Sequence, residues 1–344
     1  FGEGEVTRTE AFDTEQLRLG LTAEYEVDLW GRIRSSTEAE EYRARATLAD
    51  YRAAALTLSA EVVRTWYQLM AAQNQGGLLQ KQIETNNKVL ELLKARFGSG
   101  QTRSVDILRQ KQLLESTRQQ KHAVDTRIQV LEHQLMVLTG RPPQHNISYT
   151  PRPLPHLPPK PKTGLPAALI QRRPDIKSAH DRLQAAGKDL AAAVSSQYPR
   201  LNLTASIYTT DEGAGRLFED WARSFSGELL APLFDAGQRA AEVDRTEALR
   251  YQRLYEYGQA VLTAFQEVED ALIREKKQAD QIRSIKDRIA LAEQTYEQLR
   301  IEYFNGVSDF IDVLTALTNE QQLRRDLNKK KMGLLEFRIA LYRA

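Results

Sequence analysis

Apolar residues recur along two stretches of the chain at alternating spacings of four and three, the pattern of a coiled-coil seam. The first stretch has one polar residue, Asn86, at a seam position. Its apolar positions are Leu79, Ile83, Leu90, Leu93 and Phe97. Those of the second stretch are Ile282, Ile285, Ile289, Ala292, Tyr296, Leu299 and Tyr303. The pattern predicts two long helices, each of which buries a narrow stripe of side chains.

The two stretches belong to a duplication, in which residues 31–138 recur as residues 237–344 at a constant offset of 206. Gly100 falls opposite Gly306, and Asp106 falls opposite Asp312. No proline interrupts Arg32 to Phe97, and a helix of that extent would be roughly 100 Å long. Each long helix should end at a glycine turn and be followed by a return helix, at about 103–139 and 309–343. The function is then expected to depend on the arrangement of the repeated helices rather than on one binding pocket.

Short segments between the helices alternate apolar and polar residues, the period of a strand. The clearest is 17–29, followed by 201–210 and 224–234, and 1–11 is the weakest candidate. We expect two hairpins, 1–11 with 17–29 and 201–210 with 224–234. Strands of about ten residues with one apolar face are typical of transmembrane β-barrels. An amphipathic sheet over a soluble core is the alternative, although narrow helical seams leave no obvious core to cover.

A barrel that spans a bilayer needs at least about eight strands, so the four candidate strands of one chain cannot close one. Since every backbone group needs a partner in lipid, such a barrel would be shared between chains. Three copies of the chain would supply twelve strands.

The pattern predicts six segments in order. They are a first β-hairpin (1–30), a first helical hairpin (31–140), a linker (141–166), a helix of the second repeat (167–199), a second β-hairpin (200–236) and a second helical hairpin (237–344). The linker holds nine of the twelve prolines, which makes it extended and fairly stiff. The counterpart of the 167–199 helix would fall before residue 1. We therefore expect the chain to begin inside a strand, with any targeting segment upstream.

The composition excludes several classes of function. Charged residues make up 27% of the chain and the net charge is only +2, which offers no electrostatic case for nucleic acid. The chain has no cysteine, so thiol catalysis and Cys-ligated metals are excluded. The five histidines have no tight metal spacing, and no phosphate loop, nucleophile elbow or catalytic carboxylate pair is present. We expect no enzyme activity, no cofactor and no metal.

Five motifs span the chain in the order of a known family. They are EVDLWGR at 26–32, LIQRRPDI at 169–176, YPRL at 198–201, PLFDAG at 232–237 and AFQEV at 264–268. On these segments the chain resembles the outer-membrane efflux proteins, the TolC-like exit ducts of tripartite pumps. Within that family it is similar to the branch that works with drug and metal exporters of the resistance–nodulation–division type.

The resemblance implies a mainly α fold with a small β part, in which the duplicated helical hairpins of a homotrimer form an α-barrel through the periplasm. Four strands per chain would contribute to a shared 12-stranded barrel in contact with the lipid of a Gram-negative outer membrane. The linker would lie near the waist of the tunnel. The helix tips would meet a periplasmic adaptor protein, which joins the duct to an inner-membrane efflux pump. Whether an upstream cysteine carries lipid is left open.

The family closes its channel near the tips with a pattern like Val/Ile-Asp-Val-Leu-Asp-Ala. Here Ile311 to Ala316 keeps the first aspartate as Asp312 and has Thr315 in place of the second. A trimer would have one ring of three carboxylates from this repeat, and Asp106 is the counterpart in the first. Both aspartates also suit the beginning of a helix, where the helix dipole favours negative charge. We expect the gate at Asp312, Thr315 and Asp106.

Two further sets of residues follow from the resemblance. The adaptor-contact tips are Gly98, Ser99, Gly100, Asn305, Gly306 and Val307. The lumen of the barrel would be lined by Arg18, Thr22, Glu24, Glu26, Asp28, Asn202, Thr204 and Ser206, for which a solvated sheet face is the alternative. Trp30, Tyr25 and Trp221 are candidate interfacial aromatics or buried ones. The run from Arg172 to Asp175 is expected to form local ion pairs.

The chain is thus expected to conduct small molecules, such as drugs or metal ions, passively, with opening at the tips in place of chemistry. Energy would come from the inner-membrane partner, because nothing in the sequence binds nucleotide. The alternative from another class is a soluble or peripheral coiled-coil scaffold, which gives no reason for the apolar face of 17–29. A periplasmic adaptor would need lipoyl-like and β-barrel segments that the chain lacks.

Overall fold

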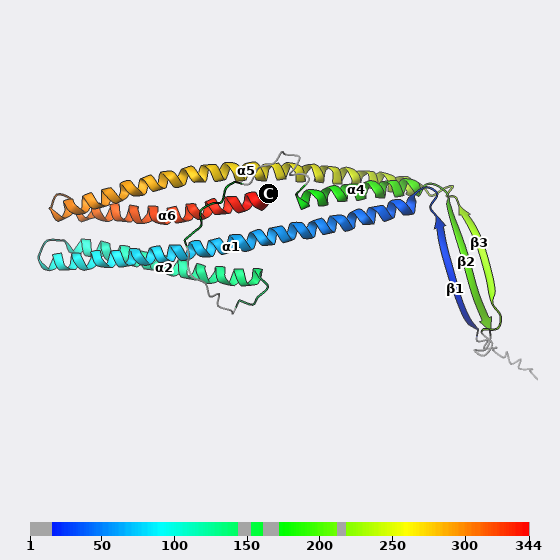
Figure 1. The fold of residues 1–344 in the computed structure, drawn as a ribbon, viewed down its shortest axis with the longest axis horizontal. Coiled ribbons are helices and arrows are strands. Elements are labelled where there is room, and N and C mark those ends of the chain that lie inside the picture. Colours follow the sequence, from blue (N-terminus) through cyan, green and yellow to red (C-terminus); the bar gives the residue numbers. More distant parts are fainter. Residues whose placement is uncertain (1–15, 144–152, 161–171, 212–217, 344) are drawn as a thin grey trace, which may run out of the picture. The chain divides into compact units, whose positions relative to one another are not determined.

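A computed structural model describes residues 16–143, 153–160, 172–211 and 218–343 (Figure 1). The chain forms two compact units, each built from two separate segments of sequence. The first unit comprises Phe1–Leu48 and Ser178–Gly258 and contains the β-sheet. The second comprises Ala49–Lys177 and Gln259–Ala344 and contains the helix tips.

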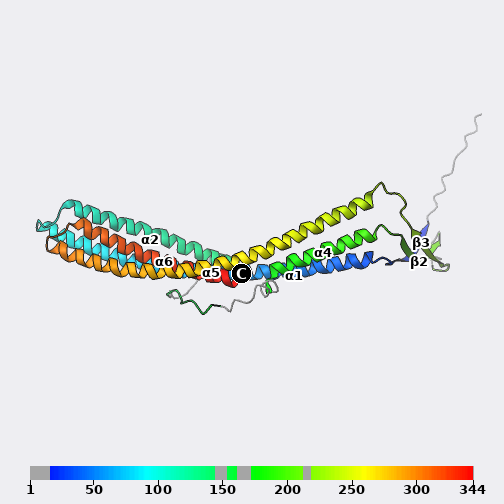
Figure 2. The same cartoon turned by 90° about the horizontal axis from the view of Figure 1, so that it is seen from above.

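Long helices dominate the structure, and their bounds reproduce the duplication. Helix α1 spans Arg32–Gly98 and α5 spans Gln238–Phe304, each 67 residues long. The return helices are α2, Ser104–Leu138, and α6, Phe310–Arg343. Every first residue in the second pair lies 206 positions after its counterpart. The predicted long helices and return helices are confirmed, and the four lie side by side in the second unit (Figure 2).

The strands form one antiparallel sheet in the order β1-β2-β3. Strand β1 spans Leu17–Val27, β2 spans Arg200–Asp211 and β3 spans Ala222–Leu230. The β2–β3 hairpin was predicted, and β1 pairs with β2 along its whole length, from Leu17 opposite Asp211 to Val27 opposite Leu201. The predicted strand at 1–11 lies outside the described residues.

Two strands stop earlier than predicted, while β2 is one residue longer at each end and β3 begins two residues earlier. Strand β1 stops at Val27 instead of Leu29, because the next residues turn to begin α1. Strand β3 stops at Leu230 instead of 234. Pro232 has no N–H to donate to a ladder, and Leu233 beyond it is 97% exposed. The alternation of apolar residues in the sequence continues beyond Leu230, so a prediction from this period alone made β3 too long.

Helix α4 spans Pro174–Ser195. A proline at the first helical position costs no hydrogen bond, which explains a beginning at Pro174. The prediction placed the beginning near 167, and residues 161–171 lie outside the described part of the chain. Of the linker, 141–143 and 153–160 are described, and 153–160 has no helix or strand.

The core of the second unit is divided among three apolar clusters. Leu69, Ala72, Leu131 and Leu135 join α1 to α2, and Ile285, Ile289, Ala292 and Leu323 join α5 to α6. Leu93 of α1 packs with Phe310 and Val313 of α6, close to the tips. No helix in the described ranges is long and apolar enough to cross a membrane.

The polar seam residue, Asn86, is fully buried and hydrogen-bonded on both sides of its amide. Its Oδ1 accepts from Gln321 Nε2 at 2.9 Å, and its Nδ2 donates to Thr117 Oγ1 at 3.1 Å. Gln110 donates to the Asn86 carbonyl at 2.9 Å. Since Gln321 belongs to α6, this network connects the two hairpins through a buried polar layer.

Candidate functional site at the helix tips and on the sheet

Both helix tips turn in the same way. At the first, which includes Gly98 and Ser99, Gly100 has φ +73° and the Gln101 N–H donates to the Arg96 carbonyl at 2.9 Å. At the second, which includes Asn305, Gly306 has φ +76° and the Val307 N–H donates to the Glu302 carbonyl at 2.9 Å. Only glycine adopts this left-handed conformation without strain, so these residues end the long helices.

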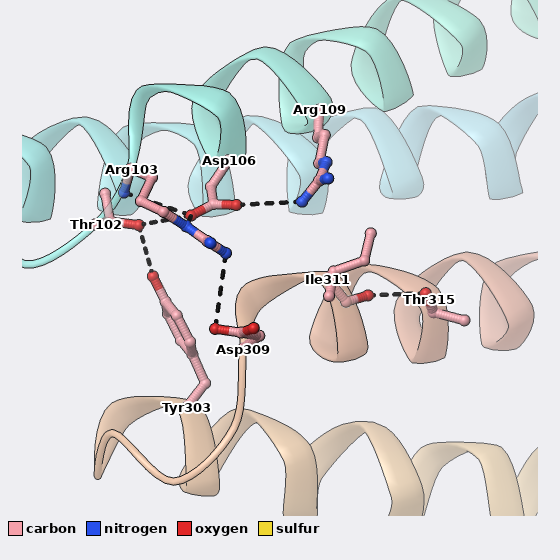
Figure 3. A network of polar contacts seen from close by, with 8 residues as sticks. All are labelled: Thr102, Arg103, Asp106, Arg109, Tyr303, Asp309, Ile311 and Thr315. Atoms are coloured by element: carbon pink, nitrogen blue, oxygen red, sulfur yellow. Dashed lines mark hydrogen bonds and ion pairs between the residues drawn. The ribbon is translucent and has the colours of Figure 1, made fainter.

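Side chains of the two hairpins meet at the tips (Figure 3). The hydroxyls of Thr102 and Tyr303 lie 2.9 Å apart. Arg103 Nη2 lies 3.6 Å from Asp309 Oδ1, although both side chains are largely exposed. The Arg96 guanidinium lies over the Tyr303 ring at 5.0 Å from its centroid. An exposed ion pair is worth at most about 1 kcal/mol, so the contact of Arg103 with Asp309 is weak by itself.

Asp106 lies inside the first tip and is only 2% exposed. Arg103 Nε is 3.5 Å from its Oδ2, and Arg109 Nη1 is 3.6 Å from its Oδ1. Thr102 Oγ1 donates to Oδ2 at 3.4 Å. The Asp106 carboxylate therefore connects the first tip internally, next to the Thr102–Tyr303 contact (Figure 3).

Asp312, the counterpart of Asp106, lies in a different environment. It is exposed at the beginning of α6 and forms no ion pair with another described residue. Thr315 is exposed as well, and its hydroxyl donates to the Ile311 carbonyl at 2.8 Å.

The duplication explains the contrast between the two aspartates. Arg103 and Arg109, which neutralise Asp106, are replaced at the equivalent positions by Asp309 and Thr315. Asp312 therefore has no arginine at either place.

Sequence reasoning missed the residues that join the tips, Thr102, Arg103, Tyr303 and Asp309. A signal was available in the comparison of the repeats. Arg103 and Asp309 occupy equivalent positions with opposite charge, which suits a contact between the two copies. Tyr303 replaces Phe97 at the end of the seam and thereby adds a hydroxyl.

The sheet has one polar and one apolar face. Along the polar face the register pairs Thr22 with Ser206, Glu24 with Thr204, and Glu26 with Asn202. The polar face continues onto β3, where Ser224, Ser226 and Glu228 are opposite Ser206, Thr204 and Asn202. The predicted lumen residues of β1 and β2 thus share a face, and Glu228, which the prediction did not include, lies on it. On the other face, Leu21 is 73% and Phe225 is 75% exposed.

Two of the acidic residues, Glu26 and Asp28, form hydrogen bonds with residues at the beginning of α1. Glu26 accepts two hydrogen bonds from Arg32, at 2.6 and 3.0 Å. Asp28 lies beyond β1, and its carboxylate accepts from the backbone N–H groups of Arg34 at 2.8 Å and Ile33 at 3.0 Å. These bonds, with that of Arg34 first, lower the pKa of Asp28. Asp28 therefore caps a helix, and a place for it in the lumen stays a prediction.

Trp30 and Arg173 have structural partners. Trp30 Nε1 donates to the Pro199 carbonyl at 2.9 Å, and its ring stacks on Tyr198 at 4.9 Å. This contact brings together two of the five motifs. Arg173 binds Asp175 at 2.7 Å, as expected, and also Glu267 at 2.8 Å. Tyr25 and Trp221 are both exposed, at 66% and 42%.

Duplicated helical hairpins with glycine tips and a sheet whose apolar face is exposed fit an outer-membrane channel. The chain belongs to the outer membrane efflux protein family, which it matches over residues 4–141 and 165–344. It is an efflux channel of the outer membrane of Gram-negative bacteria, and the coiled-coil scaffold is excluded. Its relatives are channels rather than enzymes.

Named relatives place the chain within this family. It is 27% identical over 326 residues to the pyoverdine export outer membrane protein OpmQ of Pseudomonas aeruginosa, covering 94% of this chain and 69% of OpmQ. It is 30% identical over 315 residues to the outer membrane protein OprJ of the same species, covering 90% of this chain and 65% of OprJ. The solved outer-membrane channel OprN matches with a TM-score of 0.90 at 26% identity, over 95% of this chain and 74% of that one.

Proposed function

We propose that three copies of this chain form a passive exit duct, with a shared 12-stranded barrel in the outer membrane and an α-barrel in the periplasm. The open sheet supports this proposal, because β1 and β3 each have one edge that no other described strand covers. Backbone groups at such edges need partners in lipid. Neighbouring copies of the same chain, together with the candidate strand at 1–11, would supply them.

The duct opens and closes at the helix tips. The polar contacts that join the two hairpins at the tips are the Thr102–Tyr303 hydrogen bond and the exposed Arg103–Asp309 ion pair, and they lie close to the apolar cluster of Leu93, Phe310 and Val313. Each polar contact contributes only about 1 kcal/mol. The apolar cluster between α5 and α6 keeps that hairpin intact, which favours two arrangements of intact hairpins. The polar junction between the two hairpins at the tips is the observation that carries the proposal.

In the closed arrangement, Asp312 and Thr315 of the three chains form the polar constriction. Both side chains are exposed in one protomer, and Asp312 has no arginine to neutralise it. Asp106 has a different part in the same gate. It holds Thr102 and Arg103 in place for their contacts with Tyr303 and Asp309.

A periplasmic adaptor engages the tips and favours the open arrangement, and an inner-membrane pump supplies the energy. Val307, at the second tip, is 75% exposed and offers an apolar contact. The cargo is small molecules such as drugs or metal ions. Relatives named for pyoverdine export and for cation efflux support a cargo of small molecules and ions, and we assign the choice of cargo mainly to the pump.

Current through the protein in planar bilayers tests the gate. Thr102→Val with Tyr303→Phe removes the hydrogen bond between the hairpins, worth about 0.5–1.5 kcal/mol, from each of three protomers, together with the longer bond from Thr102 to Asp106. Arg103→Gln removes the ion pair with Asp309 and one with Asp106. We expect both variants to increase the open probability.

Lys94→Gln is the matched control, because Lys94 forms an exposed ion pair within α1, with Glu91. It should leave the open probability unchanged. Equal open probability in the wild type and both tip variants would remove the tips from the gate.

A further inference from the structure

On the polar face of the sheet, near the beginning of β1, an arginine is held against an aromatic ring. The guanidinium carbon of Arg18 lies 4.3 Å from the centroid of the Tyr208 ring. Such stacking is attractive because the face of the ring is negative, and it restricts a side chain that otherwise has many rotamers. Among the described residues Arg18 forms no ion pair, and its side chain is exposed.

Gly20 makes this arrangement possible. It is opposite Tyr208 in the register, and a Cβ at position 20 would meet the Cβ of Tyr208 at 2.9 Å. A side chain at position 20 would therefore force Tyr208 away from β1. Arg18 and Gly20 lie on the same face of β1. Because Gly20 has no side chain, the Tyr208 ring can lie against Arg18.

Charge is distributed unevenly along this face. Arg18 lies at one end, and Thr22, Ser206 and Ser224 form a neutral middle. Glu24 and Glu228 lie toward the other end, where neither forms an ion pair with a described residue, and Arg200 lies on the same face at that end. Six residues of extended chain separate Arg18 from Glu24, a distance of about 20 Å. At that separation the two charged zones are largely screened from each other at physiological salt.

We propose that Arg18 stacked on Tyr208 forms a basic collar in the lumen of the barrel, where it binds anionic groups of the cargo, such as carboxylates or phosphates. The inference rests on the proposed function, since it takes the polar face as the pore lining. In a trimer the collar presents three guanidinium groups at one end of the barrel. At the other end Glu24 and Glu228 present six carboxylates beside the three guanidinium groups of Arg200, so that end remains negative. A pore with opposite fixed charges at its two ends passes current unequally in the two directions.

The test is the current–voltage curve and the reversal potential in a KCl gradient. Both are recorded in the wild type and in the Thr102→Val/Tyr303→Phe background. Arg18→Gln should reduce the rectification, because only the carboxylates at the other end remain, and raise the K⁺ to Cl⁻ permeability ratio about twofold, the size expected for charges about 10 Å from the ion path in water. Glu24→Gln with Glu228→Gln should lower the same ratio.

Two controls separate a basic collar from a structural role of the same residues. Arg223→Gln removes an equal charge from the apolar face, where Arg223 is opposite Ile207, and should change neither quantity. Tyr208→Phe keeps the ring face and should behave as the wild type. Tyr208→Ala removes the ring and should weaken the rectification.

The outcomes distinguish the collar from the duct. Normal conductance with unchanged rectification in Arg18→Gln would overturn the collar and leave the proposed function standing. An equal effect of Arg223→Gln would also overturn it. Absence of current in every background would overturn the proposed function and this inference together.

Discussion

Two aspartates at equivalent positions of the repeats have opposite environments. One is buried and holds the first tip together, and the other is exposed at the proposed constriction. Asp106 is buried beside Arg103 and Arg109, whereas Asp312 is exposed. Their helices begin alike, so the helix dipole favours both. The arginines make the difference, because they are present in only one repeat.

Replacement of Asp312 tests its proposed place in the constriction. Asp312→Ala should raise single-channel conductance in planar bilayers, because the shorter side chain widens the bore. Asp287→Ala, at an exposed carboxylate on α5, is the control and should not change conductance. Unchanged conductance in Asp312→Ala would take Asp312 out of the gate.

A buried ion pair attaches the linker to the second hairpin. Arg338 donates to both carboxylate oxygens of Glu275, at 2.8 and 2.9 Å, and both side chains are 5% exposed. Arg338 also donates to the carbonyls of Pro158 and, at 3.2 Å, Pro159. One arginine therefore holds α5, α6 and the linker together.

Removal of one member of this pair should be costly. Arg338→Met leaves the Glu275 carboxylate buried without its main partner, and we expect a loss of about 3–5 kcal/mol. The double variant Arg338→Met/Glu275→Leu should recover most of that loss, since no charge is left buried. Thermal unfolding in detergent measures both, and equal melting temperatures for the two variants would contradict the role of the uncompensated charge.

The same pair predicts a dependence on pH. The hydrogen bond from Arg338, with Lys160 as a weaker influence, lowers the pKa of Glu275 below its usual value. A carboxyl group whose pKa is lowered in the folded state stabilises it above the unfolded pKa, about 4.3, and loses that contribution as the pH falls through the folded pKa. The stability difference between the wild type and Arg338→Met/Glu275→Leu should therefore be constant from pH 5 to 8 and shift against the wild type below about pH 4. A difference that does not change with pH would contradict this linkage.

At the scale of helices, the two hairpins have the same outline and different seams. The second hairpin is apolar at Ala292, Ala316 and Leu323. The equivalent residues of the first are Asn86, Gln110 and Thr117, which bind one another and Gln321 of α6. A polar residue in a seam specifies register at a cost in stability. The polar residues of the first hairpin thus specify how the second hairpin packs against it.

Removal of the Asn86 side chain from this polar layer should lower the free energy of unfolding more than removal of an exposed amide does. Asn86→Ala leaves the buried side chain of Gln321 without its hydrogen-bond partner, whereas Thr117 keeps its bond to the Leu113 carbonyl. A buried polar group left unpaired costs about 1–3 kcal/mol. Gln80→Ala on the exposed side of the same helix should change stability by less than about 0.5 kcal/mol. The melting temperatures of the two variants in detergent check this, and similar values would argue against a specifying role for Asn86.

At the scale of the whole molecule, one chain provides an open sheet, and closure requires further copies. Extraction of the protein from outer membranes in mild detergent, followed by mass measurement, should give three times the mass of one chain. A stable monomer would contradict the shared barrel. This measurement is independent of the gate, because the tip contacts described here lie within one chain.

The sequence by itself determined the duplication, the length of the helices and the alternating faces of the strands, because these follow from local periodicity and from glycine and proline. It also determined the family, through motifs such as EVDLWGR. Only the tertiary structure decided which residues meet across the repeats. The pairing of Thr102 with Tyr303, the burial of Asp106 but not Asp312, and the stacking of Arg18 on Tyr208 depend on chain segments far apart in sequence or on neighbours across a sheet. Local patterns do not encode such contacts, because the same residue types suit both a solvated surface and a packed interface.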